Sequence, residues 1–550
     1  MIRLPIFKTH FTLAFFALLL TILLPINTFA QEIIWKKSFG SVINSYESVT
    51  AVSDGIVVAG RGAGFNYADW EGVLGKGGSD AIVLKYDNKG NVIWKKNFGG
   101  ESYDTFFSVT EVPEGVVAVG YSNDFSFNTG DWEGITNKGA EDAIIVKFDK
   151  KGNVIWKKNF GGIIFDHFCS VTTVSDGIVA VGHSEGSLDT GDWEGIASKG
   201  DSDAIIVKYD FDGKLIWKRN FGGKGRNGFS AVAKLSNSIF AVGRSDYKSF
   251  GNGDWEGVEG KGAGDAILVK YDNDGNVVWK KSFGGEGGDA FESVITTSDG
   301  IITVGFSFEK SFGTGDWKGF VAKGKVDAII VKFDFAGNVV WKNNFGGIDD
   351  GIFESVTEVI DGFVAVGNAY FISFNTGDLE GITGKGKYDA IVVKYDKEGN
   401  VVWKNGFGGI SQDWYSSVAR VGNSIVAVGV SYCDSFGTGD WEGIECRGGH
   451  AMDAIIIKYA DGEIGIDEPE KDVTEISVFP NPTAGQLQIT SHKLRITGVE
   501  IYDVYGRKLY EQKSNLTVLL SYDLTVFPAG IYIIKISTEK GIVNKKIIKQ

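Results

Sequence analysis

Residues 98–159 read FGGESYDTFFSVTEVPEGVVAVGYSNDFSFNTGDWEGITNKGAEDAIIVKFDKKGNVIWKKN. Four strand-like runs, separated by turn signals, lie in or at the edge of this segment: FFSVTEV, GVVAVGYS, DAIIVKF and NVIWKKNF. They are short and rich in Val, Ile, Phe and Trp, with no helical period between them. DAIIVKF is apolar without strict alternation, as expected when both faces of a sheet are covered. The segment therefore predicts a unit of four strands.

This unit occurs seven times. The motif Trp-Lys-x-x-Phe-Gly recurs at intervals of 59, 62, 61, 62, 62 and 62 residues, at Trp35, Trp94, Trp156, Trp217, Trp279, Trp341 and Trp403. A second marker, Asp-Trp in a long connection, recurs in phase, with Leu379 replacing the Trp in the sixth copy. Residues 31–464 number 434, which is seven times 62.

Four strands per unit repeated seven times predict an all-β fold, a seven-bladed β-propeller. The ends of the repeat region provide a check. EIIWKKSFG, at residues 32–40, is a fourth strand with no third strand before it, and DAIIIKYADGE, at 453–463, is a third strand with no fourth after it. We expect the N-terminal strand to close the last blade, because pairing these two strands removes two exposed sheet edges. A linear solenoid would need capping units, and none is visible.

The run DAIIVKFDKKGNVIWKKNFGG at 142–162, with near copies at 80–100, 203–223, 265–285, 327–347 and 389–409, resembles the short bacterial seven-bladed β-propeller repeat. The resemblance covers about four-fifths of the chain. It implies a fold and hardly any activity, because propellers serve many functions.

Six repeats each contain one aspartate three residues before a Gly: Asp87, Asp149, Asp210, Asp272, Asp334 and Asp396. Half of a calcium loop is one interpretation, but the spacing is not that of an EF-hand and no bidentate Glu follows. We favour a hairpin turn with Gly at the left-handed position. The Trp residues after this turn are expected to pack between blades. They resemble the tryptophan-docking positions of quinoprotein propellers, but that family normally needs eight blades and a quinone pocket, and neither is evident in this sequence.

The long connection between the second and third strands carries the candidate ligand-binding residues. They are Asp69, Trp70, Asp131, Trp132, Asp192, Trp193, Asp254, Trp255, Asp316, Trp317, Asp440 and Trp441, with Asp378 and Leu379 in the sixth copy. The connections between second and third strands and those between blades emerge on one face, so these loops share a rim with the Phe-Gly-Gly loops. Either the rim binds sugar rings by stacking on Trp and hydrogen bonding to Asp, or Trp packs inward and Asp caps the loop. Leu379 favours packing, because Leu fills an apolar slot but cannot stack as an aromatic ring does.

Catalysis needs unlike groups gathered in one place, and most polar side chains here follow the sevenfold repeat. The four His after residue 30, His167, His183, His450 and His492, each stand alone in the sequence, without a His-x-x-x-His pair. We name no catalytic residue, metal site or cofactor. A polysaccharide-degrading enzyme stays an alternative, because paired carboxylates abound.

Charge and the N-terminus define the expected compartment. The chain carries 55 basic and 70 acidic residues, for a net charge of −15, which would repel nucleic acid. Residues 1–30 combine basic residues, an apolar run from Phe11 to Leu24 and a Thr28-Phe29-Ala30 end, a pattern typical of an export signal cleaved after Ala30. An uncleaved anchor is the alternative. No later segment is apolar for long enough to span a membrane.

Three cysteines fit an extracytoplasmic compartment. Cys433 and Cys446 flank one loop, and a local disulfide between them would contribute roughly 3 kcal/mol in the entropic picture. Two free thiols are the alternative, because sequence does not show whether their Cβ atoms meet. Cys169 is expected to be a small strand residue.

An acidic linker at 465–473 precedes the C-terminal tail. In the tail, Pro-Asn-Pro, Tyr-Gly-Arg and Pro-Ala-Gly turns separate alternating apolar strands. This pattern predicts a small antiparallel sandwich over 474–550. The tail closely resembles the C-terminal sorting domain of the type IX secretion system of Bacteroidota. The matching residues are Pro480-Asn481-Pro482-Thr483, Gly485, Tyr502-Asp503, Gly506-Arg507, Ala529-Gly530-Ile531-Tyr532 and Lys545-Lys546-Ile547-Ile548. The resemblance implies passage through the periplasm, recognition by the outer-membrane translocon, and release or attachment at the cell surface. A plain adhesive sandwich is the alternative.

We therefore predict four parts: a signal peptide at 1–30, a propeller at 31–464, a linker at 465–473 and a sorting domain at 474–550. The function expected is that of a secreted or surface-displayed, non-catalytic binding module for carbohydrate or another surface polymer. A polysaccharide-degrading enzyme and a purely structural surface protein are the alternatives.

Overall fold

A computed structural model describes residues 32–186, 189–449 and 451–461 of the repeat region. In the tail it describes 476–479, 483, 485–491, 496–503, 508–513, 519–525, 527–528, 530–538 and 541–549. The predicted signal peptide, the linker, His450, His492 and the Pro480-Asn481-Pro482 and Gly506-Arg507 turns lie outside these residues.

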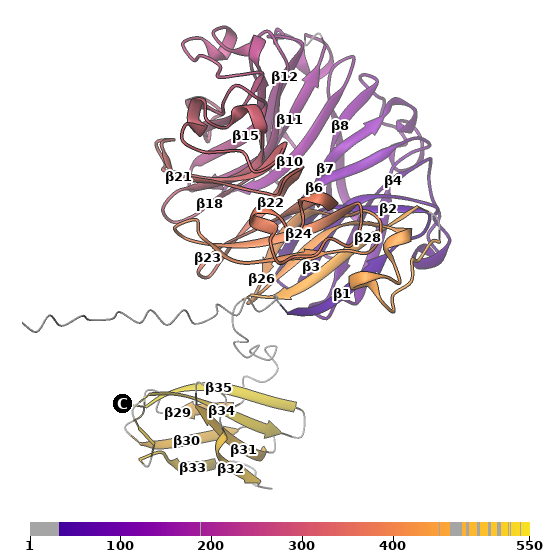
Figure 1. Cartoon of the computed structure of the whole chain (residues 1–550). Coiled ribbons are helices and arrows are strands. Elements are labelled where there is room, and N and C mark those ends of the chain that lie inside the picture. The colour runs from indigo at the N-terminus through magenta and orange to yellow at the C-terminus, as the bar shows by residue number, and fades with distance from the viewer. Residues whose placement is uncertain are drawn as a thin grey trace, which may run out of the picture. The chain divides into compact units, whose positions relative to one another are not determined.

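The repeat region consists of antiparallel four-stranded units (Figure 1). The first strands are β2 (Ile43–Val52), β6 (Asp104–Val112), β10 (Asp166–Val174), β14 (Asn227–Leu235), β18 (Asp289–Thr296), β22 (Gly351–Val359) and β26 (Asp413–Val421). The second strands are β3 (Gly55–Ala63), β7 (Gly115–Asn123), β11 (Gly177–Glu185), β15 (Ser238–Asp246), β19 (Ile301–Phe308), β23 (Gly362–Tyr370) and β27 (Ser424–Tyr432).

The third strands are β4 (Asp80–Tyr86), β8 (Glu141–Asp149), β12 (Ser202–Tyr209), β16 (Gly264–Asp272), β20 (Val326–Phe333), β24 (Tyr388–Asp396) and β28 (Met452–Ala460). The fourth strands are β5 (Val92–Phe98), β9 (Val154–Phe160), β13 (Leu215–Phe221), β17 (Val277–Phe283), β21 (Val339–Phe345), β25 (Val401–Phe407) and, from the start of the chain, β1 (Ile33–Phe39). First strands of successive blades contact one another, so they lie nearest the axis.

Two sets of short 3-10 helices occupy the connections between second and third strands. One set carries the Asp-Trp motif: η1 (Ala68–Trp70), η3 (Gly130–Trp132), η4 (Gly191–Trp193), η6 (Gly253–Trp255), η8 (Gly315–Trp317), η10 (Gly377–Leu379) and η12 (Gly439–Trp441). The other set comprises η2 (Asp124–Ser126), η5 (Tyr247–Ser249), η7 (Glu309–Ser311), η9 (Phe371–Ser373) and η11 (Cys433–Ser435). In the part of the chain that the structure describes, no helix is long and apolar enough to cross a membrane.

Ring closure follows from strand pairing. Five units are separate four-stranded sheets, and an eight-stranded sheet joins β2–β5 to β26–β28 with β1 paired to β28. The join is one parallel pair, Ile43 with Met452, and the same kind of bridge links each other blade to the next, as in Glu141 with Phe165. Across the same junction, the Val49 N–H donates to the Ser417 hydroxyl. The pairing of these described residues agrees with the seven sequence repeats.

Six of the outer tryptophans pack on the next blade, as predicted: Trp35, Trp94, Trp156, Trp217, Trp279 and Trp341. The Trp35 indole N–H donates to the Asn88 carbonyl (3.2 Å), and its ring lies against Gly90, whose φ of 80° is left-handed. A Cβ on Gly90 would lie 3.2 Å from the indole ring, so glycine serves both the turn and the contact. The turn aspartate Asp87 accepts N–H bonds from Lys89 and Asn91, both 2.8 Å, as expected of a hairpin cap.

The tail contains two sheets. One has the order β29 (Ile476–Phe479), β30 (Gln486–Ser491), β33 (Leu519–Asp523). The other has the order β32 (Lys508–Lys513), β31 (Ile496–Asp503), β34 (Gly530–Thr538), β35 (Gly541–Lys549). Leu487, Ile489, Val499, Ile501 and Ile534 are buried in one apolar cluster drawn from both sheets. The predicted antiparallel sandwich is therefore present.

Candidate functional site

The motif tryptophans of the rim loops are buried. Trp70, Trp132, Trp193, Trp255, Trp317 and Trp441 have 0% exposure, so they offer no face for a sugar ring. In the second blade, the Trp132 N–H donates to Ser122 (3.0 Å) and to the buried Asp104 (3.2 Å), and its ring packs edge-on against Phe98. The interpretation of these tryptophans as stacking platforms is wrong, because the loop folds each ring into the blade.

The sixth blade supports this packing role through three coupled replacements. Leu379 replaces the Trp, and Gly351 and Ala369 stand where the second blade has Asp104 and Ser122. A buried carboxylate without its donors costs free energy, so the loss of the indole N–H is matched by the loss of its acceptors. The Trp is thus one member of a buried hydrogen-bonded group.

The motif aspartates clamp neighbouring blades. Asp192 accepts the Gly161 N–H (3.0 Å) and the Lys138 ammonium of the preceding blade (2.6 Å). The same pairing recurs around the ring: Lys76–Asp131, Lys199–Asp254, Lys261–Asp316, Lys323–Asp378 and Lys385–Asp440, with Arg447–Asp69 at 3.7 Å across the closure. The Phe-Gly-Gly and Asp-Trp loops therefore share one rim, and these carboxylates already have partners.

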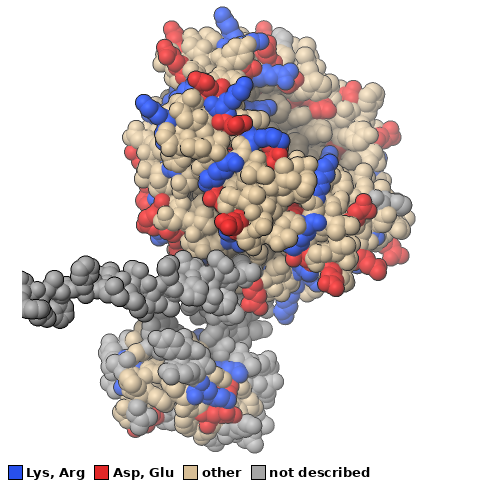
Figure 2. Space-filling model, in the orientation of Figure 1, with Lys and Arg blue, Asp and Glu red and all other residues tan. Residues whose placement is uncertain are grey.

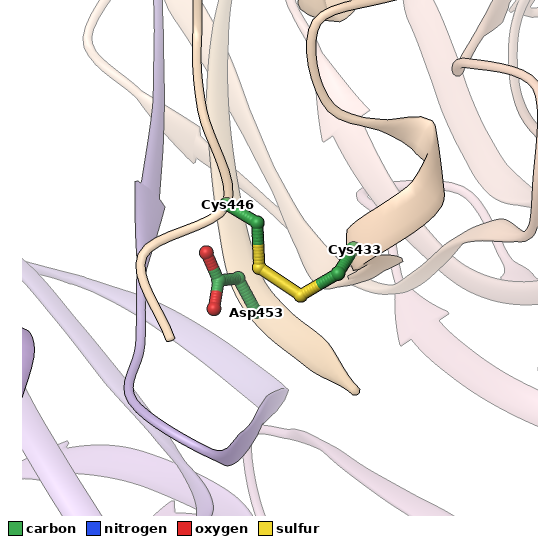
Figure 3. Close-up of side chains that lie close together, drawn as sticks. All are labelled: Cys433, Cys446 and Asp453. Carbon is green, nitrogen blue, oxygen red and sulfur yellow. A yellow bond between two sulfur atoms is a disulfide. The ribbon is translucent and has the colours of Figure 1, made fainter. Parts of the chain in front are cut away.

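Cys433 and Cys446 form a disulfide with a Cα–Cα distance of 5.2 Å (Figure 3). It staples the rim loop of the last blade, which is the blade completed by the N-terminal strand. Asp453 lies beside the two sulfur atoms (Figure 3). Because the sulfurs are bonded to each other, this group is not a set of metal ligands.

The departures from the repeat lie near the axis, on the rim face where first strands begin and second strands end. In six blades, strand pairing is defined for one position near the start of the first strand, two residues before the β-bulge described below. The residue at this position pairs with a residue near the end of the second strand, and no two blades have the same pair. The pairs are Ser45–Arg61, Thr105–Tyr121, His167–His183, Gly228–Arg244, Ala290–Phe306 and Ile352–Asn368. Elsewhere these strands repeat closely, so this ring of positions is where the blades are individual.

A β-bulge two residues further on adds a second set. The register shifts around one extra residue in each first strand, and this residue is partly exposed although its neighbours are largely buried. The bulged residues are Glu47, Phe107, Cys169, Ser230, Glu292 and Glu354. Electrostatic coupling between non-adjacent blades, Cys169 with Glu292 and Glu354 with Glu47, shows that they converge on the axis. We call the variable pairs and the bulged residues together the axial basin.

Burial raises the pKa of two glutamates of the axial basin, Glu354 and Glu292, and repulsion by neighbouring carboxylates adds to the effect at Glu354. Desolvation, with the negative charges of Glu292 and Glu47, raises the pKa of Glu354 to about 8. Desolvation also raises the pKa of Glu292, against the opposing effects of Ser230 and Arg244. Glu354 is therefore protonated at neutral pH and can donate a hydrogen bond.

A pocket of about 500 Å³ opens beside Glu354. Its lining includes Phe306, Phe308, Ile352, Asn368, Tyr388, Trp414 and Asp350. Tyr388 and Trp414 pack edge to face with ring centroids 6.3 Å apart, and Phe306 and Phe308 do so at 5.8 Å. Partly exposed aromatic rings next to carboxyl and amide groups provide stacking surfaces together with hydrogen-bonding groups.

Two histidines expected to stand alone lie together in the basin. The rings of His167 and His183 are 4.9 Å apart, and His167 Nε2 lies 2.5 Å from Glu141 Oε2. The Cys169 sulfur is 3.7 Å from His183 Nδ1. Burial, with the nearby His167 and Arg244, lowers the pKa of His183 to about 4, so it is neutral at pH 7. Their separation by 16 positions concealed a cross-strand pair that only register reveals.

Fold and site together define a closed β-propeller whose repeated residues build the frame and whose singular residues line the axis. The tail is more specific. Residues 477–550 match the family described as a secretion system C-terminal sorting domain. This match agrees with the resemblance to the type IX sorting domain and indicates export by that system to the cell surface or the medium.

Solved structures similar to this chain include BamB from Moraxella catarrhalis, at 11% identity over 78% of this chain and 100% of that chain, with a TM-score of 0.36. An apocarotenoid oxygenase mutant from Synechocystis matches at 11% identity over 89% and 96%, with a TM-score of 0.35. The phage phi92 endosialidase matches at 9% identity over 87% and 74%, with a TM-score of 0.38. Scores of this size carry no statement about ligand or activity. The sequence has no match among curated proteins.

Proposed function

We propose that the exported propeller is a binding module for carbohydrate and that the ligand occupies the axial basin, not the Asp-Trp loops. The observation that carries this proposal is the pocket of about 500 Å³ whose lining combines the aromatic rings of Trp414, Tyr388, Phe306 and Phe308 with the polar groups of Glu354 and Asn368. Sugar rings present C–H faces that pack on aromatic rings and hydroxyls that pair with carboxyl and amide groups. Export past the outer membrane places such a module among extracellular polymers.

The test is glycan binding by the full-length protein and by Trp414→Ala. Trp414 is partly exposed and lines the pocket, so its loss should weaken binding by about tenfold or more while the melting temperature changes little. Trp132→Ala is the matched control for a buried Trp, and it should lower the melting temperature. Unchanged glycan binding by Trp414→Ala would contradict the assignment of the basin.

A glycoside-cleaving enzyme is the second candidate, favoured by one observation. Glu354 keeps its proton at neutral pH, and the partly exposed Asp350 lines the same pocket; a general acid mechanism uses one protonated carboxyl together with a second carboxyl. Reducing-sugar release that disappears in Glu354→Gln would favour the enzyme. Retention of glycan without turnover would favour the binding module.

A further inference from the structure

A second pocket, of about 230 Å³, adjoins the aromatic pocket and shares Phe306 and Phe308 with it. Arg226 and Arg244 line it, and both side chains are exposed to solvent. Electrostatic coupling of Arg244 to Glu292 and to His183 places it at the basin. The two guanidinium groups therefore flank one hollow that continues into the proposed sugar site.

Neither guanidinium has an ion-pair partner among the described residues. The acids that also line this pocket make hydrogen bonds of their own: Asp289 accepts from Ser311 (2.7 Å) and the Gly285 N–H (3.0 Å), and Asp246 accepts the Lys248 N–H. Glu292 interacts electrostatically with Arg244 without forming an ion pair with it. Two guanidinium groups beside one hollow, neither of them ion-paired, can bind an external anion.

Two glycines keep this pocket open, and the backbone does not require them. Neither Gly264 nor Gly288 has a positive φ. A Cβ on Gly264 would come no nearer than 3.5 Å to any other atom, and a Cβ on Gly288 would meet only the Phe308 ring, at 3.2 Å. The sixth blade has Tyr388 at the position of Gly264. The absence of side chains here is therefore a property of the site and not of the fold.

We propose that the ligand of the basin is an acidic glycan whose carboxylate binds Arg226 and Arg244 while its sugar ring lies on Phe306 and the aromatic pocket. This inference rests on the proposed carbohydrate function and specifies its ligand class. The planar carboxylate matches the fork of a guanidinium group, which binds it through two parallel N–H bonds. The aromatic floor between the two pockets is where the ring that carries this carboxylate would pack.

The experiment measures the affinity of the full-length protein for a polyuronate, for its methyl ester and for a neutral polysaccharide, at about 0.15 M salt. This salt concentration screens the net charge of −15, which otherwise opposes the approach of a polyanion. We expect wild-type protein to bind the polyuronate at least tenfold more tightly than its methyl ester. Arg244→Gln and Arg226→Gln should each weaken polyuronate binding by about 10- to 100-fold.

Two variants complete the design. Gly264→Tyr fills the pocket and leaves both guanidinium groups in place, so it should abolish the preference for the polyuronate without lowering the melting temperature. Arg219→Gln is the matched control, because Arg219 lies on the outer strand β13 over Trp217. It should change polyuronate affinity by less than about twofold.

Equal binding of the polyuronate and its ester, or unchanged affinity in both arginine variants, would overturn the acidic-glycan assignment. If neutral glycans still bound in a Trp414-dependent way, the proposed function would stand alone. Tight binding of a sulfated polymer, without binding of the polyuronate, would contradict the assignment of a carboxylate as the anionic group of the ligand. Absence of binding to every polysaccharide would overturn both proposals.

Discussion

At the scale of single residues, the buried indole groups decide how the Asp-Trp motif is interpreted. Trp132, Asp104 and Ser122 form one buried group, and the sixth blade replaces all three members, with Leu379, Gly351 and Ala369. Groups joined by buried hydrogen bonds are coupled, because removing one leaves the others without partners.

This coupling is measurable in the second blade. We expect Trp132→Leu alone to lower the free energy of unfolding by about 3–5 kcal/mol, from lost packing and an underbonded Asp104. The triple variant Trp132→Leu/Asp104→Gly/Ser122→Ala, which copies the sixth blade, should recover about 1–3 kcal/mol of that loss. Urea denaturation measures both. Additive effects of the three single changes would mean that the members act independently.

Glu354 predicts a pH dependence of stability. Its pKa is about 8 in the folded protein against an ordinary value of 4.5, so the folded state holds a proton that the unfolded state releases between these values. The stability contributed by this group is therefore complete below about pH 4.5 and is lost as pH rises through 8.

We expect Glu354→Gln to remove that loss. Relative to wild type, the variant should gain stability between pH 5 and 9 by on the order of 2–4 kcal/mol. Thermal or urea denaturation across this range measures the difference in stability between variant and wild type. Asp142 and Asp265, each with a pKa raised to about 6, also lower stability as the pH rises, but both proteins contain them, so their contributions cancel in the difference. A difference independent of pH would contradict the shifted pKa.

At the scale of elements, each rim loop is held to the blade before it. The Asp192 carboxylate accepts the Gly161 N–H and pairs with the Lys138 ammonium, which also donates to the Asn159 carbonyl (2.7 Å). Without Lys138, the acceptors left behind belong to the partly exposed Asp192 and Asn159, which water can reach, whereas without the carboxylate the buried Gly161 loses its N–H acceptor. The carboxylate therefore contributes more to stability than its counterion. Charges of both signs are interspersed on the face seen in Figure 2, which fits these local pairs and not a single-sign patch.

Asp192→Ala should lower the free energy of unfolding by about 1–3 kcal/mol, because the Gly161 N–H loses its acceptor as well as the ion pair. Lys138→Ala should cost less than about 1 kcal/mol, as a partly exposed ion pair does. Denaturant titrations of the two variants make the comparison. Equal effects would show that the ion pair and not the backbone bond holds the loop.

At the scale of the whole molecule, the ring depends on a strand from one end of the repeat region completing the blade at the other. β1 pairs with β28, and Trp35 packs on Gly90 across the junction that closes the ring. Trp279 makes the equivalent contact inside the ring, donating to the Phe335 carbonyl (3.3 Å). Substituting each of the two tryptophans therefore tests the closing junction against an internal one.

Trp35→Ala and Trp279→Ala should lower the melting temperature to a similar extent, each costing about 2–4 kcal/mol, because both remove a half-buried indole between blades. Differential scanning calorimetry of the full chain measures both. A harmless Trp35→Ala beside a damaging Trp279→Ala would mean that the N-terminal strand is not part of the ring.

Sequence patterns alone were enough to predict the four-stranded unit, its seven copies and the closing strand, because these depend on a pattern that recurs at a fixed period, and the sorting tail, because its turn motifs are local. Only the tertiary structure decided which face of the Asp-Trp loop is buried and where a singular site lies. Arg244, Phe306, Glu354 and Trp414 are spread over four repeats, and each is unremarkable in its own strand. They become one basin because ring closure brings the first strands of the blades, together with the second strands paired to them, to a common axis. This relation between distant residues is recorded in no local pattern.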